Sequence, residues 1–180
     1  MRAGIQNVIR DEPVAAAAIA VALGGMAAIL GAWFFQYVLG YAPCPLCLQQ
    51  RVPYYVVIPL AVLVAAGALA KWPRQLLAAG LAGIALAMLY NAGLGVYHAG
   101  VEWKWWAGPQ ECAALSNLGS GGNLLERAQS ARIVRCDEAA WHFLGLSLAG
   151  YNVLISLVLA AVAAAGARAA QPYGSSSVSQ

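Results

Sequence analysis

The sequence predicts an all-α membrane protein, a bundle of four transmembrane helices with one long loop. Apolar residues of the AVILMFWYC set make up 62% of the 180 residues and charged residues only 9%, whereas about 25% of a soluble domain is charged. Four segments also contain no Asp, Glu, Lys or Arg, namely 13–50, 52–70, 75–101 and 139–167. A helix crosses the hydrocarbon core with about 20 apolar residues, so each segment can span a membrane.

Within these segments the expected helices run over about 14–35, 50–70, 75–97 and 143–167. A single segment of this kind could be a buried helix of a soluble protein, but four with almost nothing polar between them argue against that reading. The first is also too long for the apolar region of a signal peptide, which has about 7–15 residues. We therefore expect one membrane domain over 1–168 and a disordered, serine-rich tail over 169–180.

The first helix is expected to begin at Asp11-Glu12-Pro13, because proline is tolerated in a first helical turn. It is rich in small residues, with Ala15 to Ala18 and Gly24-Gly25. Small residues allow helices to approach closely in lipid. After a non-basic connector over 36–42, the second helix follows and turns back into the third through the short loop at 71–74.

The one long connection, about 98–142, is expected to form the outer loop. It opens with Trp103, Trp105 and Trp106, which suit the headgroup layer. After a Gly/Ser-rich stretch, Leu124–Val134 has apolar residues at helical spacing, which predicts a short amphipathic helix lying on the membrane.

Four spans place both termini on one side of the membrane. The termini side carries Arg2, Arg10, Lys71, Arg74 and Arg168, and the other side carries Arg51, Lys104, Arg127, Arg132 and Arg135. The Lys/Arg count is a tie, but the termini-side segments are shorter, and this density favours cytoplasmic termini. The net charge of +3 is too small and scattered to suggest binding to nucleic acid.

All four cysteines fall in connections on the face opposite the termini. Cys44 and Cys47 form a C-x-x-C pair before the second helix, and Cys112 and Cys136 lie 24 residues apart in the long loop. Four cysteines allow three connectivities. Their shared face is expected to be in an oxidising compartment such as the periplasm.

Four kinds of site can be compared with this cysteine pattern. A structural zinc site favours two C-x-x-C knuckles, but the second pair is not a knuckle and no nearby histidine completes a set. A C-type haem needs histidine at position 48, which is leucine. Inert structural disulfides stay open, although a C-x-x-C bridge closes too small a loop to stabilise much. A redox site is favoured, since such pairs have tuned thiol reactivity.

Cys47 is expected near the first turn of the second helix, where the macrodipole favours an anion. Arg51 follows four residues later on the same helical face. Both features favour a Cys47 thiolate. Arg51 is also the first charge after 38 uncharged residues, and an ionisable residue at membrane depth is functional by default. The alternative is an interfacial anchor reaching the headgroups.

Taken together, these residues resemble the DsbB family of bacterial disulfide bond formation proteins, over about residues 30–155. The matching features are Gln36, Pro43-Cys44-x-x-Cys47, Arg51, Cys112, Cys136 and Trp141-His142-Phe143-Leu144-Gly145-Leu146. The resemblance implies a quinone-reducing thiol oxidase of the bacterial inner membrane. Such an enzyme reoxidises a DsbA-like periplasmic disulfide donor and passes the electrons to ubiquinone or menaquinone dissolved among the membrane lipids.

The resemblance also implies a role for each site residue. Cys112–Cys136 would be the loop disulfide that the reduced partner attacks, with Cys112 forming the mixed disulfide and Cys136 then exchanging with Cys44. Cys47 would face the quinone as a thiolate.

Arg51 would polarise a quinone oxygen in this scheme, with the hydrophobic connector and the tryptophans as apolar walls. His98 matches a family histidine linked to the quinone region, although its place at the loop entrance also suits an interfacial residue. A non-catalytic scaffold with structural disulfides and a metal-binding membrane protein are the alternatives to this function.

Overall fold

The computed structural model describes residues 2–108, 136, 139 and 141–171, with side chains from Pro13 onward. The elements are α1 (Arg2–Trp33), the π-helical turn η1 (Phe34–Val38), α2 (Pro45–Leu69), α3 (Arg74–Glu102), β1 (His142–Phe143), β2 (Leu146–Ser147) and α6 (Leu148–Ala170). The described residues contain four helices long and apolar enough to cross a membrane, so the predicted fold class is confirmed. The expected amphipathic helix over 124–134, Cys112 and the tail over 172–180 lie outside the described residues.

The first helix is longer than expected at both ends. It begins at Arg2 instead of about residue 14, and Pro13 lies inside it, so Asp11-Glu12-Pro13 is not its start. Proline removes one backbone hydrogen bond from a helix interior without necessarily ending the helix. At the other end the helix continues as the π turn Phe34–Val38.

The second helix begins at Pro45, five residues before the expected start. Cys44 is its N-cap, with an extended backbone, and the Cys44 sulfur accepts a hydrogen bond from the Cys47 N–H at 3.2 Å. Pro45 occupies the first helical position, where its missing N–H costs nothing. Cys44 and Cys47 therefore both belong to the first turn of α2, and the start of this helix fixes where the two side chains lie.

The short connection between α2 and α3 is a Schellman ending. Lys71 takes a positive φ of 58°, and the Trp72 N–H donates to the Gly67 carbonyl at 2.9 Å, which is the bond that defines this motif. The α3 helix ends in the same way around Lys104, with a φ of 60°. These caps satisfy carbonyls that helix ends otherwise leave without a partner.

The segment before α6 is a two-residue hairpin, where we expected a helix from 143. Leu144 and Gly145 have φ values of 48° and 80°, as a type I′ turn requires, and positive φ is incompatible with a right-handed helix. The hairpin ends at Ser147, whose hydroxyl accepts the Gly150 N–H at 3.2 Å and caps α6. The family-like Phe-Leu-Gly-Leu stretch is therefore a turn that sets the start of the helix.

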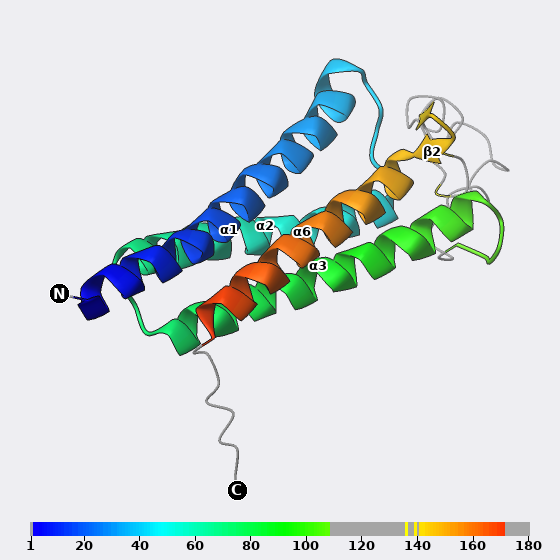
Figure 1. Cartoon of the computed structure of the whole chain (residues 1–180). Coiled ribbons are helices and arrows are strands. Elements are labelled where there is room, and N and C mark those ends of the chain that lie inside the picture. Colours follow the sequence, from blue (N-terminus) through cyan, green and yellow to red (C-terminus); the bar gives the residue numbers. More distant parts are fainter. Residues whose placement is uncertain (1, 109–135, 137–138, 140, 172–180) are drawn as a thin grey trace, which may run out of the picture.

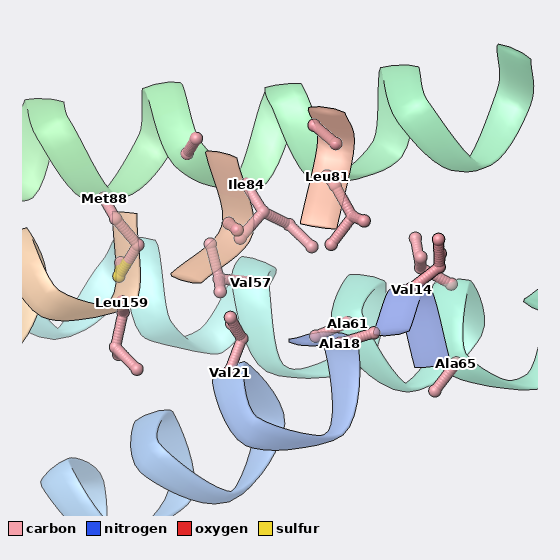
Figure 2. Close-up of a cluster of buried hydrophobic side chains, with 14 of the residues drawn as sticks. Val14, Ala18, Val21, Val57, Ala61, Ala65, Leu81, Ile84, Met88 and Leu159 are labelled. Carbon is pink, nitrogen blue, oxygen red and sulfur yellow. The ribbon is translucent and has the colours of Figure 1, made fainter. Parts of the chain in front are cut away.

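Aliphatic side chains from all four helices form the core (Figure 2). Among its fully buried members are Val21 of α1, Val57 of α2 and Ile84 of α3. Small residues allow the closest approaches: a Cβ at Gly166 would lie 2.6 Å from the Ala17 Cβ. This agrees with close helix packing at small residues in membrane proteins.

The bundle has two distinct ends (Figure 1). Both described ends of the chain and the α2–α3 connection lie together at one end. The start of α2, the end of α3 and the hairpin lie at the other, where α1 leans away from α6 (Figure 1). The cysteines described by the structure all belong to this second end.

Candidate redox site

Three of the four cysteines meet at the splayed end of the bundle. The sulfurs of Cys44 and Cys47 lie 2.7 Å apart, and either can donate to the other. Cys136 packs into the same small apolar cluster with Cys44, Leu46 and Val101. Cys44 and Cys136 are 2% and 1% exposed, so this part of the site excludes water.

The surroundings of Cys44 favour its neutral thiol. The pKa of Cys44 is raised far above its ordinary value, first by the side-chain hydrogen bond with Cys47, then by burial and by the charge of Cys47. The backbone N–H of Cys47 acts in the opposite direction. A thiolate formed on Cys44 therefore needs a further donor, and His98 can supply one, because its Nε2 lies 3.6 Å from the sulfur.

Arg51 is held in place from the neighbouring helix. One guanidinium nitrogen donates to the Gln36 side-chain oxygen at 2.6 Å, and another reaches the Ala32 carbonyl at 3.5 Å. Gln36 lies in the π turn η1, and π turns are frequent at functional sites. Gln36 was singled out only by resemblance; the structure gives it a physical task, the orientation of Arg51.

His98 lies inside the bundle one turn before the end of α3, and its side chain is 3% exposed. Its Nδ1 is 2.9 Å from the side-chain nitrogen of Gln50. Its Nε2 faces Cys44 and also lies 3.8 Å from Glu102 Oε1. The histidine thus connects the cysteine pair to polar groups deeper in the bundle.

A cavity of about 800 Å³ opens beside Cys47 and Arg51. Its walls come from α1, η1, the connector before α2, the start of α2, the end of α3, the hairpin and α6. They are mostly apolar and include Phe35, Trp141, Phe143, Ile155 and Leu159. Ligand cavities of proteins have volumes of roughly 300–1,000 Å³, so the space is large enough for a small organic ligand with an apolar body.

The tryptophan in the cavity wall is not one of those that we expected there. Trp141 belongs to its wall, whereas Trp103, Trp105 and Trp106 do not. The Trp106 indole instead donates to the Tyr97 carbonyl at 2.8 Å beyond the end of α3. The Schellman ending of α3 turns this cluster away from the cavity.

Buried and half-buried amides and hydroxyls next to the site were missed by sequence reasoning. They are Gln50, Tyr54, Asn91, Asn152 and Ser156, which come from α2, α3 and α6. A signal was present, because polar residues inside membrane spans are rarely without a task. Periodicity could not show that they face one another.

The described residues also contain one group of potential metal ligands, Cys44, Cys47 and His98, with ligand atoms within 4.8 Å of one another. Two thiolates on one tetrahedral zinc, with Zn–S bonds of about 2.3 Å, would be about 3.8 Å apart. The observed 2.7 Å between the sulfurs is shorter than this separation.

Comparisons with known proteins agree with this geometry. The family model described as "Disulfide bond formation protein DsbB" matches residues 15–166. Disulfide bond formation protein B 2 of Pseudomonas aeruginosa is 32% identical over 166 residues, covering 84% of this chain and 91% of the relative. Disulfide bond formation protein B of a Polaromonas species is 28% identical over 150 residues, covering 79% and 83%.

A protein of Rickettsia prowazekii named only as uncharacterized is 29% identical over 135 residues, covering 73% of this chain and 75% of the relative. No solved structure matches the chain. The family match covers most of the sequence, including α2, which carries the cysteine pair and Arg51. The chain belongs to the DsbB family of disulfide bond formation proteins and is a multi-pass membrane protein.

Proposed function

We propose that this chain is a quinone-reducing thiol oxidase that reoxidises a DsbA-like periplasmic disulfide donor. The observation that carries the proposal is the packing of Cys136 against Cys44, with Cys47 and Arg51 at an apolar cavity. Disulfide exchange requires Cys136 to lie next to Cys44, and electron transfer requires Cys47 to lie next to the acceptor. A scaffold with inert disulfides would not need it.

The cysteines would act in sequence. The reduced partner attacks the Cys112–Cys136 disulfide at Cys112, which releases Cys136. The Cys136 thiolate attacks Cys44, so that a Cys44–Cys136 bond forms, the Cys44–Cys47 bond breaks and the electron pair leaves on Cys47. Burial of Cys44 and Cys136 in one cluster supports this direction of attack, since exchange requires the attacking sulfur to reach its target.

The acceptor would occupy the cavity beside Cys47. A bound ubiquinone or menaquinone supplies a two-electron oxidant, which is needed because a DsbA-type partner is itself strongly oxidising, at about −120 mV. Cys47 presents its sulfur to this cavity at the N-terminal end of a helix, where negative charge is favoured. Arg51, oriented by Gln36, would hold the acceptor through an oxygen.

The proposal places the chain in the bacterial inner membrane with both termini cytoplasmic. The cysteine end of the bundle would then face the periplasm, where disulfides persist. The opposite arrangement would expose the site to the reducing cytosol.

The experiment is turnover by the purified protein with ubiquinone and a reduced DsbA-like partner, followed by thiol trapping. We expect the parent to oxidise the partner, and both Cys47→Ser and Cys112→Ser to abolish turnover. Normal turnover in either variant would refute the relay. If the disulfides, once reduced, are never restored by added quinone, the chain is a scaffold instead of an oxidase.

A further inference from the structure

A chain of hydrogen-bonded side chains runs from the cysteine pair into the membrane core. It links His98 of α3 to Gln50 of α2, then to Asn152 of α6 and Tyr54 of α2. Gln50 and His98 are 7% and 3% exposed. Polar groups within a membrane are costly unless they are fully hydrogen-bonded. A hydrogen-bonded series of four side chains therefore indicates a functional role for these groups.

The direction of each bond can be followed from the far end. The Tyr54 hydroxyl donates to the Asn152 side-chain oxygen at 2.8 Å. The Asn152 nitrogen therefore faces Gln50 and donates to its side-chain oxygen, also at 2.8 Å. This turns the Gln50 nitrogen toward His98, with 2.9 Å to Nδ1.

The last bond fixes the tautomer of the histidine. An amide nitrogen can only donate, so His98 Nδ1 must accept from Gln50. A neutral imidazole carries one hydrogen, which must then be on Nε2. Nε2 lies 3.6 Å from the Cys44 sulfur, within hydrogen-bond reach of sulfur, whereas 3.8 Å to Glu102 is too long for a hydrogen bond to oxygen.

We propose that Gln50 and Asn152 are positioning residues, which hold His98 with its hydrogen on Nε2 so that it donates to Cys44. The donor serves the step that closes the cycle, and in this respect the inference rests on the proposed function. When the Cys112 thiolate attacks Cys136, a Cys112–Cys136 bond forms, the Cys44–Cys136 bond breaks and the electron pair leaves on Cys44. The Cys112 thiolate for this step is released when the second thiol of the partner attacks the mixed disulfide, which leaves the partner oxidised. The histidine N–H stabilises the departing Cys44 thiolate, which the buried site otherwise disfavours.

The chain offers a direct spectroscopic test, because it contains only two histidines. In a His142→Gln background, ¹⁵N-histidine labelling leaves His98 as the single imidazole of the protein. Its two nitrogen shifts distinguish a protonated nitrogen from an unprotonated one. We expect protonated Nε2 and unprotonated Nδ1 in the parent, and a mixture of tautomers in Asn152→Leu.

Asn91→Leu is the matched control. Asn91 is a fully buried asparagine of α3. Its side chain bonds Ser156 at 2.9 Å and Asn152 at 3.4 Å, but no hydrogen bond joins it to Gln50 or His98. The control should keep the parent shifts. If Asn152→Leu does not fold, Gln50→Met tests the same link from the next position.

The functional readout is the split between kcat and KM. Loss of a hydrogen bond to a charged group should lower kcat about tenfold, in Asn152→Leu and Gln50→Met alike, while KM for the partner stays constant. Protonated Nδ1 in the parent, or parent shifts in both variants, would overturn the proposal. The nitrogen shifts are read without turnover, so failure of the oxidase assay alone would refute the proposed function and leave this tautomer assignment standing.

Discussion

The anchoring of Arg51 by Gln36 leads to a quantitative prediction. Gln36→Leu keeps the approximate size of the side chain but removes the acceptor that lies 2.6 Å from the guanidinium. Among the residues that the structure describes, this guanidinium also reaches the Ala32 carbonyl at 3.5 Å, at the limit of a hydrogen bond. The arginine in the variant would therefore keep its charge and lose its orientation.

The magnitude follows from the type of bond that is lost. Hydrogen bonds to charged groups contribute about 1.5–3 kcal/mol, and each 1.4 kcal/mol corresponds to about a tenfold change in an equilibrium constant. If the acceptor in the cavity binds through Arg51, its KM should rise by roughly tenfold or more. The KM for the thiol partner should not change, because the partner acts at the loop cysteines.

The assay is steady-state oxidation of the reduced partner at a series of ubiquinone concentrations. Gln49→Leu is the matched control, since Gln49 is an exposed glutamine on the same end of the bundle. We expect the control to keep the parent KM for quinone. An unchanged KM in Gln36→Leu would refute the account of how Arg51 is held.

Three further predictions concern other parts of the molecule. Arg74→Ala removes donors to the carbonyls at the end of α6, one of them at 2.9 Å. The variant should have a free energy of unfolding in detergent that is lower by about 1–3 kcal/mol. Equal stability of variant and parent would contradict the capping of α6 by Arg74. Gly100→Ala would make a Cβ clash with the Trp106 ring. This should lower the free energy of unfolding by about 1–3 kcal/mol and change the tryptophan fluorescence. Gly31→Ala is the control, because a Cβ there meets nothing within 4 Å, and it should change neither the stability nor the fluorescence. In the reduced protein, the raised pKa of Cys44 keeps it a thiol at neutral pH, so its alkylation should accelerate only at strongly alkaline pH. An alkylation rate that rises over the pH range of an ordinary cysteine would show that the side-chain hydrogen bond between Cys44 and Cys47 does not act as described.

The spans were predictable because lipid imposes a simple requirement on sequence. Charge-free segments located all four helices, but not where they begin and end. Pro45 and Cys44 start α2 through a local cap, and Leu144-Gly145 delays α6 through a positive-φ turn. Such boundaries depend on a few backbone hydrogen bonds, to which hydropathy is insensitive.

The site was predictable only where its residues are close in sequence. Helical spacing placed Cys47 and Arg51 on one face, and resemblance brought in Cys136 and His98. The amides of Gln50 and Asn152 could not be paired in advance, because their contact depends on how α2 and α6 are rotated about their axes. That rotation is set by packing of small residues along the whole bundle.

The central claim is that electrons from the partner leave through Cys47 to a quinone. Its most direct test is an anaerobic titration of reduced partner with the purified protein and ubiquinone, in which quinol and partner disulfide are both quantified. We expect equimolar quinol and disulfide with the parent and no quinol with Cys47→Ser. Partner oxidation without quinol, or quinol formation by Cys47→Ser, would contradict the claim.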